Sequence, residues 1–352
     1  FNADGWYPTL GAAQSQDSPW YSWYRFLHWP DSYDSWWGIH TLPAVEESAP
    51  SYVDFIIDGE NSIIRRWLRA GASGWRLDVA DELPDWFLVK IRAAMEETAP
   101  DSVLIGEVWE DGSNKISYSQ RRQYLLGSET HGLMNYPFRT ALMAYLLGGG
   151  AEYFRDSMEQ LRENYPAPAL HVLMNFISTH DTERALTVIA DEPANGRGRE
   201  WQSGRNVSGE AYEEGMLRLR MAYAIIYTLP GVPCVYYGDE IGMQGYRDPF
   251  NRAYFDWNST ERRLRVPLSN LARLRRNCDA FDGGSMELVE ASADVLHYRR
   301  VGKEQSAEII LNNGPHLIVR TAFGKQTEVN PGGFTILVED NQPQHVGYFK
   351  YY

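Results

Sequence analysis

The segment SGWRLDVADELPDWFLVKIRAAMEETAPDSVLIGEVW, residues 73–109, decides the fold because it reads as strand, helix and strand. Two short apolar runs enclose a stretch of helical periodicity at residues 85–97. The alternation continues along the chain, with apolar runs at 132–138, 173–181 and 231–240 and helical stretches at 138–147 and 211–229. Strands that alternate with helices of this length predict an α/β fold built on a parallel sheet.

The C-terminal ends of the apolar runs distinguish a barrel from an open sheet. In four of the five runs an acidic residue stands at that end: Asp78, Glu107, Asp181, and Asp239 with Glu240. Barrel enzymes place their chemistry at the C-terminal ends of their strands. An open nucleotide-binding sheet would show a glycine-rich phosphate turn after an early strand, and the sequence contains none. The pattern therefore predicts a (β/α)8 TIM barrel.

Two regions of different composition flank this barrel, which we expect to span residues 48–282. Residues 1–47 are typical of an irregular, aromatic-rich loop region, because they hold six of the twelve tryptophans without clear periodicity. The tryptophans are Trp6, Trp20, Trp23, Trp29, Trp36 and Trp37. A helical pattern runs from about residue 52, with Trp67 on its apolar stripe, and ends at Gly71.

After a last helix at residues 270–281, the hydrophobic period changes from that of a helix to that of a strand. Five runs predict a C-terminal antiparallel β-sandwich domain over residues 283–352. The runs are MELVEAS (286–292), DVLHYRRV (294–301), SAEIILNN (306–313), HLIVRTAF (316–323) and FTILVED (334–340).

The number of strands falls short of a closed barrel. Five predicted strands precede the β domain, whereas a closed barrel needs eight, so these would be strands 4 to 8. A five-stranded piece would leave unpaired edges and an open core. We therefore expect the first strands to lie in a missing N-terminal part of the same polypeptide, which would be a folding partner of this chain.

Composition excludes several classes of protein. A chain of 352 residues with 43% hydrophobic residues is long enough to bury a sizeable core. Its net charge of −14 disfavours binding to nucleic acid or to an anionic membrane surface. No apolar run reaches membrane-spanning length, so we expect no membrane insertion. Cys234 and Cys278 fall in a predicted strand and a predicted helix, which argues against a disulfide framework or a zinc site.

The acidic residues at the strand ends suggest a pair of catalytic carboxylates. Side chains alternate along a strand, so Arg76 and Asp78 share one face, and their pairing would hold the aspartate ionised, as a glycosyl nucleophile requires. Glu107 stands between Gly106 and the apolar Val108 and Trp109, an environment that favours the protonated carboxyl of a general acid. Adjacent strands would bring the two carboxyl groups to the separation of about 5 Å that a retaining mechanism needs.

A third acidic group ends the run LMNFISTHD, where His180 and Asp181 could together hold two sugar hydroxyls. At any single strand end, a buried ion pair without chemistry explains the residues about as well as catalysis does. That alternative weakens when three strand ends repeat the pattern.

Three segments resemble, in order and spacing, signature regions of the α-amylase superfamily: GWRLDVADE (74–82), IGEVW (105–109) and FISTHD (176–181). TLPAVE (41–46) is similar to the family's short motif near the end of the inserted loop domain, and GVPCVYYGDEIGM (231–243) to its last barrel strand. MNYPF (134–138) and the DP…NR pattern (248–252) resemble the neopullulanase, cyclomaltodextrinase and amylopullulanase-like branch.

This resemblance implies a retaining glycoside hydrolase that cleaves α-1,4 bonds, and in some members α-1,6 bonds, in starch, maltodextrin or pullulan. Asp78 would be the nucleophile, Glu107 the acid/base and Asp181 the stabiliser of the transition state, with no cofactor needed for the chemistry. Six further residues would bind the glucan substrate: Arg76 and His180 at the nucleophile and sugar, Glu82 and Trp109 toward the leaving group, and Asp248 and Arg252 on the non-reducing side.

Two departures from the family pattern limit what the resemblance implies about function. The family's first signature region, with its asparagine and histidine, has no counterpart here, which agrees with the expected absence of the first barrel strands. Asp81 and Glu82 replace the Lys-His of many plain α-amylases, so strict α-amylase specificity is not implied. The family often holds a structural calcium ion in its loop domain, but Asn2 and Asp4 supply too few oxygen ligands to predict that site.

Two other functions stay open. One is a transglycosylase or an α-1,6-cleaving enzyme, because loops rather than the carboxylates select the acceptor and the linkage. The other is a catalytically silent carbohydrate-binding or transporter-associated homologue, although such proteins usually lack part of the carboxylate set. The early tryptophans, such as Trp36 and Trp37, could stack on sugar faces, but we expect most of them to pack in the core of the loop domain, because large aromatic side chains are usually buried. The resemblance fits a secreted or cell-surface bacterial protein and also a cytoplasmic one.

Overall fold

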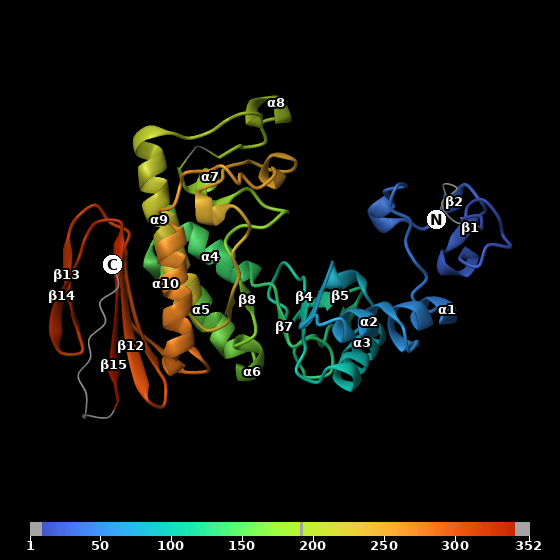
Figure 1. The fold of residues 1–352 in the computed structure, drawn as a ribbon, viewed down its shortest axis with the longest axis horizontal. Helices are drawn as coiled ribbons and strands as arrows, with labels where there is room; N and C mark the ends of the chain where they lie inside the picture. The colour runs from blue at the N-terminus through green and yellow to red at the C-terminus, as the bar shows by residue number, and fades with distance from the viewer. Residues whose placement is uncertain (1–8, 191–192, 342–352) are drawn as a thin grey trace. The chain divides into compact units, whose positions relative to one another are not determined.

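The computed structural model describes residues 9–190 and 193–341, which fold into two compact units. The first unit comprises residues up to Leu104 together with Gly127–Thr130, and the second comprises Ile105–Leu126 and the chain from His131 onward. Figure 1 shows the elements of each unit. Within the described ranges, no helix is long and apolar enough to cross a membrane.

The first unit opens with an irregular region that contains little regular structure. Two short strands, β1 (Phe26–His28) and β2 (Ser32–Tyr33), pair antiparallel. Aromatic contacts hold this region together, because the Trp23 ring lies 5.3 Å from the rings of both Tyr52 and Phe55. The indole of Trp29 donates to the carbonyl of Ala12 at 3.0 Å.

Short helices follow, in place of the single helix expected from residue 52 to residue 71. They are α1 (Pro50–Val53), the π-helical turn η3 (Asp54–Asp58) and α2 (Ile63–Arg69). A longer helix, α3 (Asp85–Thr98), follows the next strand, where helical periodicity was expected. The expected continuous helix was wrong because Gly59 takes an extended ψ of 145° and the Ser62 hydroxyl bonds the Ile57 carbonyl at 2.8 Å. Trp67, expected on the apolar stripe, is more than half exposed.

The strand β3 (Gly74–Leu77) places alternate residues on opposite faces, as expected. Trp75 and Leu77 pack on the apolar cluster formed by α1, η3, α2 and α3. The strand β4 (Val103–Gly106) begins beside it, because the Val103 amide donates to the Ser73 carbonyl at 3.0 Å. A Cβ at Gly74 would lie 2.1 Å from the Val103 carbonyl oxygen, so this close approach requires glycine.

The second unit contains the rest of the parallel strands. They are β7 (Gly132–Leu133), β8 (Met174–Asn175) and β9 (Val232–Pro233). Ile105 of β4 pairs parallel with Gly132, Met134 bridges to Met174, and Met174 pairs parallel with Val232. The predicted parallel arrangement is thus confirmed within this unit. The strands are shorter than the apolar runs, because the C-terminal half of each run leaves the ladder.

Three helices of the second unit, α4, α9 and α10, lie where helical periodicity was expected, although α10 begins earlier than predicted, and the sequence analysis missed the other four that the structure describes. The helices of this unit are α4 (Tyr136–Leu146), α5 (Ala151–Asn164), α6 (Ala167–Leu170), α7 (Ala185–Ala190), α8 (Arg199–Gln202), α9 (Gly209–Thr228) and α10 (Arg265–Asn277). In Figure 1, α9 and α10 run side by side. A short hairpin, β5 (Ile116–Ser117) and β6 (Gln120–Arg121), precedes β7.

The C-terminal part of the second unit is antiparallel, as predicted. A four-stranded sheet has the order β10-β11-β12-β15, and β13 and β14 form a separate hairpin. The bounds are β10 (Ser285–Ser292), β11 (Val295–Val301), β12 (Gln305–Asn312), β13 (Ile318–Ala322), β14 (Lys325–Val329) and β15 (Gly333–Asp340). The sequence analysis missed β14, whose KQTEV segment lacks alternating apolar residues. Ala322 and Val329 of the hairpin pack on Ile310 of the sheet.

A buried arginine joins this sheet to the helices. Arg300 on β11 is fully buried and donates to the carbonyls of Thr228, Gly284 and Ser285. Beside it, the hydroxyls of Thr228 and Tyr298 lie 2.5 Å apart. The C-terminal end of α9 is therefore fixed to the sheet by polar contacts.

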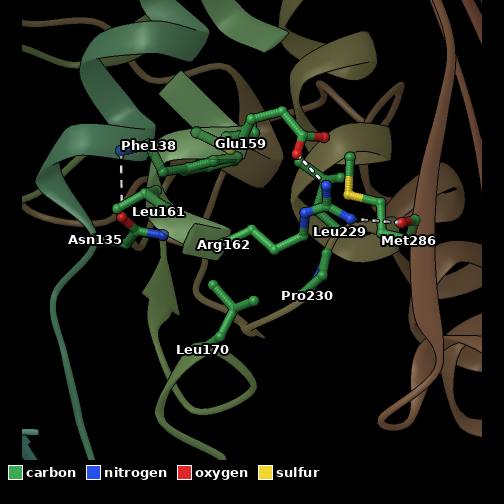
Figure 2. Close-up of a pocket in the computed structure, with 10 residues that line it drawn as sticks. Asn135, Phe138, Glu159, Leu161, Arg162, Leu170, Leu229, Pro230 and Met286 are labelled. Atoms are coloured by element: carbon green, nitrogen blue, oxygen red, sulfur yellow. Dashed lines mark hydrogen bonds and ion pairs between the residues drawn. The ribbon is translucent and has the colours of Figure 1, made fainter. Parts of the chain in front are cut away.

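A crevice lies where α4, α5 and α6 approach β10, and Figure 2 shows the residues that line it. Its volume is about 30 Å³, room for a single water or two but far below the several hundred Å³ of ligand pockets. Asn135 at its edge accepts from the Phe138 amide at 3.2 Å and so caps α4. The crevice is a packing feature rather than a substrate site.

Candidate active site

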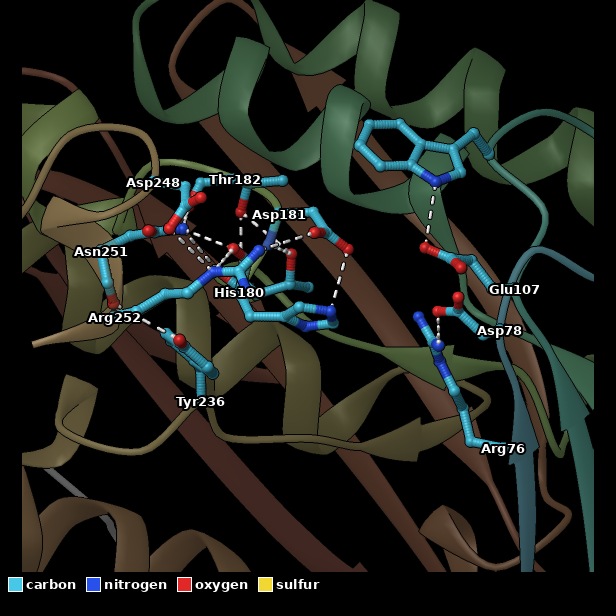
Figure 3. Close-up of polar contacts among 12 residues, drawn as sticks. Arg76, Asp78, Glu107, His180, Asp181, Thr182, Tyr236, Asp248, Asn251 and Arg252 are labelled. Atoms are coloured by element: carbon cyan, nitrogen blue, oxygen red, sulfur yellow. Dashed lines mark hydrogen bonds and ion pairs between the residues drawn. The ribbon is translucent and has the colours of Figure 1, made fainter. Parts of the chain in front are cut away.

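In the first unit, the candidate nucleophile follows β3 directly. The Arg76 guanidinium donates to Oδ1 of Asp78 at 2.6 Å, so the pairing expected between these residues is present (Figure 3). The Asp78 side chain is 78% exposed, which leaves the carboxylate accessible. The next residue, Val79, has a φ of 41°, a conformation that costs a β-branched residue about 1–3 kcal/mol. Such strain at the end of a strand is typical of functional sites.

The candidate leaving-group residue of this unit, Glu82, lies beside an exposed aromatic pair. Its Oε1 accepts from the Trp37 indole at 3.2 Å. Trp36 and Trp37 stack with ring centroids 4.7 Å apart and planes 8° apart. Because Trp37 is mostly exposed, it is not part of a loop-domain core.

In the second unit, the candidate acid/base follows β4. Glu107 is only 4% exposed, and its Oε1 accepts from the Trp109 indole at 3.1 Å. The Trp109 ring stacks on Tyr136 at 4.2 Å, and Tyr136 meets Phe176 edge-on at 4.9 Å. Glu107 thus has the aromatic surroundings expected from its neighbours in the sequence. Its separation from Asp78, which lies in the other unit, stays a prediction.

The third carboxylate follows β8 and is held on both oxygens. Oδ1 of Asp181 lies 3.3 Å from Nη2 of Arg252, and Oδ2 lies 3.1 Å from Nε2 of His180. The Asp181 amide donates to the Thr179 hydroxyl at 3.1 Å. The Asp181 side chain is 30% exposed, so it can still reach a solute.

The two candidate outer residues connect directly to this carboxylate. Arg252 Nε lies 3.3 Å from Oδ1 of Asp248 and donates to the His180 carbonyl at 3.0 Å. Figure 3 shows Arg252 reaching both Asp248 and the His180–Asp181 pair. The structure therefore brings together four of the predicted site residues of this unit, whereas the sequence analysis had assigned His180 and Asp181 to the sugar and Asp248 and Arg252 to the non-reducing side of the glucan.

One residue that the sequence analysis did not single out also belongs to this group. Asn251 is fully buried, and its amide nitrogen lies 2.7 Å from the carbonyls of both His180 and Thr182. The only signal in the sequence is its place inside the DP…NR pattern.

The fourth acidic strand end has a different environment. Asp239 lies 3.2 Å from Nη1 of Arg184, and both side chains are at most 1% exposed. Burial raises the pKa of Asp239 to about 6, although hydrogen bonds from Ser178 and Tyr223 and the charge of Arg184 oppose that rise. Arg184 also lies under the rings of Tyr236 and Tyr237. This pair therefore supports the loops rather than facing a substrate.

No group of three or more metal-binding side chains occurs among residues 9–190 and 193–341. Asn2 and Asp4, the two oxygen ligands considered for calcium, lie outside the described residues.

Comparison with known proteins gives a family match over most of the chain. Residues 12–280 match the family model described as "Alpha amylase, catalytic domain". The amylopullulanase of Thermoanaerobacter thermohydrosulfuricus is 29% identical over 94% of this chain and 23% of its own length. The amylopullulanase of Thermoanaerobacterium saccharolyticum is 30% identical over 84% of this chain and 24% of its own length. This chain thus spans about a quarter of the length of these relatives.

Similarity extends to the smaller neopullulanase 2 of Thermoactinomyces vulgaris, which is 29% identical over 78% of this chain and 42% of its own length. Among solved structures, a cyclic α-maltosyl-(1→6)-maltose hydrolase from Arthrobacter globiformis has a TM-score of 0.77 at 23% identity, over 94% of this chain and 70% of that one. The type III pullulan hydrolase from Thermococcus kodakarensis has a TM-score of 0.76 at 24% identity, over 93% and 56%. These likenesses show a shared fold.

Proposed function

Because this chain belongs to the α-amylase family, as its match to the catalytic-domain model over residues 12–280 shows, we propose that it carries the active-site carboxylates of a retaining glycoside hydrolase. The substrates are α-1,4-linked glucans such as starch and maltodextrin, and pullulan with its α-1,6 bonds. The names of the related amylopullulanases and neopullulanase support this choice. The observation that carries the proposal is an acidic side chain with a specific donor after each of three parallel strands: directly after β3 and β4, and in the turn between β8 and α7.

The proposed reaction is a double displacement. Asp78 attacks the anomeric carbon while Glu107 gives its proton to the glucosidic oxygen, so that the C–O bond breaks and a glucosyl ester of Asp78 forms. Water then attacks the same carbon, Glu107 takes its proton, and the carboxylate of Asp78 leaves. Asp181 bonds the sugar hydroxyls most strongly in the transition state. These side chains and water suffice, so the reaction needs no cofactor.

The remaining candidate residues bind and orient the glucan in this proposal. Arg76 orients the Asp78 carboxylate through its contact at 2.6 Å. Trp109 is 49% exposed on the far side of its stack with Tyr136, and that indole face suits a glucosyl ring on the leaving-group side. Glu82 belongs to the same side, whereas His180 contacts the sugar beside the nucleophile. Asp248 and Arg252 bind the non-reducing side.

The same proposal covers the finer architecture. The parallel strands would be five of the eight in a (β/α)8 barrel, and the remaining strands would come from outside residues 1–352. The antiparallel sheet and the β13–β14 hairpin would form a C-terminal sandwich, since Ala322 and Val329 pack on the sheet. Expression of this chain with and without upstream sequence tests the first part, because an open barrel should be inactive alone.

The decisive experiment compares carboxylate variants of the polypeptide that contains residues 1–352 and its upstream sequence. We expect Glu107→Gln to lower turnover of starch and pullulan by about 10²–10⁴-fold, and Asp78→Asn at least as much. Asp156→Asn and Glu96→Gln are matched controls on exposed helix positions and should leave turnover unchanged.

Stereochemistry gives a second readout. The first product released should keep the α-configuration. NMR of the anomeric proton of the newly released reducing end, recorded before mutarotation, can show this. Inversion, or activity near that of the wild type in Asp78→Asn, would overturn the assignment. Equal inertness of wild type and Asp78→Asn toward starch and pullulan would favour a binding module.

A further inference from the structure

The turn that carries His180 and Asp181 has little regular structure of its own. The strand β8 ends at Asn175 and α7 begins at Ala185, so the residues between them leave both the sheet and the helix. Two local bonds shape the turn: the Thr179 amide donates to the Thr182 hydroxyl at 3.0 Å, and the Asp181 amide donates to the Thr179 hydroxyl at 3.1 Å. Its carbonyl groups need donors from elsewhere in the chain.

The side-chain amide of Asn251 supplies those donors. Its nitrogen lies 2.7 Å from the His180 carbonyl, 2.7 Å from the Thr182 carbonyl and 3.5 Å from the Thr179 carbonyl. An amide nitrogen carries two hydrogens, which match the two short contacts. The opposite orientation would direct the amide oxygen at three carbonyl oxygens, so the hydrogen-bond network fixes the orientation of this group.

Asn251 is itself rigidly held. It is fully buried in the short helix η6 (Phe250–Arg252), and the Tyr236 hydroxyl donates to its backbone carbonyl at 3.4 Å. Its amide oxygen is buried and has no hydrogen-bond partner among the described residues. A buried oxygen without a partner destabilises the fold. The favourable contribution of this side chain therefore comes from its N–H groups.

The neighbouring residue holds the same turn. Arg252 donates to the His180 carbonyl at 3.0 Å and contacts the Asp181 carboxylate at 3.3 Å. One carbonyl therefore accepts from two consecutive residues that lie about 70 positions away in the chain. Figure 3 shows Asn251 and Arg252 on one side of the His180–Asp181 pair. Asn251 fixes the backbone of the turn, and Arg252 fixes the backbone and the carboxylate.

From this geometry we propose that Asn251 is a positioning residue, which sets the place of Asp181 through the backbone of residues 179–182. The proposal rests on the function proposed above for Asp181. A misplacement of about 1 Å at a reacting group can cost about 10²-fold in rate. Because Asp181 acts mainly in the transition state, the loss falls on kcat rather than on KM.

The test uses Asn251→Asp, which keeps the shape of the side chain but replaces its donors with a carboxylate that faces carbonyl oxygens. We expect kcat on pullulan to fall about 10²-fold with KM nearly unchanged. The affinity of a cationic iminosugar of glucose configuration, which resembles the charged transition state, should fall in parallel. Asn258→Asp makes the same chemical change at an exposed position and should alter none of these values.

A purely structural role would give another result: less folded protein, with kcat and inhibitor affinity of the folded fraction unchanged, and this would overturn the proposal. Hydrogen exchange of the amides of residues 178–183 supplies a readout that does not depend on activity. It should be faster in Asn251→Asp than in Asn258→Asp, and equal exchange would overturn the proposal even if the wild type proves inactive. An active wild type with a fully active Asn251→Asp would remove this inference and leave the proposed function standing.

Discussion

Asp181 and Asp239 follow neighbouring parallel strands of the same unit, β8 and β9, and each pairs with an arginine. Their surroundings differ in one respect that matters. The Asp181 side chain is 30% exposed and its partner Arg252 is 45% exposed. Asp239 and its partner Arg184 are at most 1% exposed. The same pair of residue types thus faces solvent at one strand end and is enclosed at the next.

This difference separates a carboxylate that can act on a substrate from one that stabilises the fold. An enclosed pair gives up the hydration of both charges, and the raised pKa of Asp239 shows that Arg184, Ser178 and Tyr223 do not fully offset this loss. The two charges of an exposed pair lose little hydration, and the carboxylate can exchange its contact with arginine for one with a sugar hydroxyl. An acidic residue at a strand end is therefore a candidate for catalysis only when a substrate can reach it.

Removal of the enclosed cation should have the largest effect on stability. Arg184→Met leaves Asp239 buried without its cation, and we expect the free energy of unfolding to fall by about 3–5 kcal/mol at pH 7. Urea denaturation followed by tryptophan fluorescence measures this change. A loss below about 1 kcal/mol would place Arg184 in the same class as an exposed pair and would remove the contrast.

Removal of the exposed acid should instead act on the rate. In Asp181→Asn we expect kcat on pullulan to fall by about 10²–10³-fold, as for the loss of one group that stabilises a transition state. The midpoint of urea unfolding should hardly move. Steady-state kinetics and denaturation on the same preparation check both, and a variant that loses stability but keeps its rate would reverse the comparison.

The pH dependence of stability should come from the enclosed acid. The pKa of Asp239 is about 6 in the folded protein, above its ordinary value of 3.8, so the folded state binds this proton more tightly than the unfolded state. Its contribution is therefore most favourable below pH 4, falls as pH rises from 4 to 6 and is constant above. The change is about 3 kcal/mol, at about 1.4 kcal/mol per pH unit.

The matched variant Asp239→Asn isolates this contribution. The difference in unfolding free energy between wild type and Asp239→Asn, measured in urea from pH 4 to pH 7.5, should decrease with pH. A difference that stays flat or increases would mean that Arg184 fully offsets the burial of the carboxylate.

Removal of the exposed cation should have the smallest effect on stability. Arg252→Met breaks a pair that solvent screens, so we expect the free energy of unfolding to fall by less than about 1 kcal/mol. Activity should still fall, because Asp181 loses one of its two partners. Paired with Arg184→Met, this variant makes the same change at both sites, and equal stability losses would contradict the contrast drawn above.

Local patterns in the sequence were sufficient for much of the fold. Alternation placed Trp75 and Leu77 against the helices and left Arg76 to meet Asp78, because strand geometry alone determines which residues share a face. Glu107 has aromatic neighbours as its sequence context indicated. Helical periodicity found α3, α4, α9 and α10 within a few residues of their bounds.

The remaining features depend on contacts that no local pattern records. The break at Gly59 depends on a single backbone angle, and β14 is held by pairing with β13 rather than by its own apolar residues. The burial of Asp239 and the donors of Asn251 arise from segments far apart in the chain. The sequence placed Asp239 at a strand end, like the catalytic candidates, and Asn251 inside the DP…NR pattern, but neither pattern indicated burial.

The contacts of Arg300 bear on how this protein can be cut for expression. A truncation before residue 283 would remove the donor to the Thr228 carbonyl and the Tyr298 hydroxyl beside it, at the buried end of α9. Buried polar groups left without partners each destabilise a fold by about 1–3 kcal/mol. The C-terminal strands are consequently not a detachable module, and shortened versions of the chain should retain them through β15.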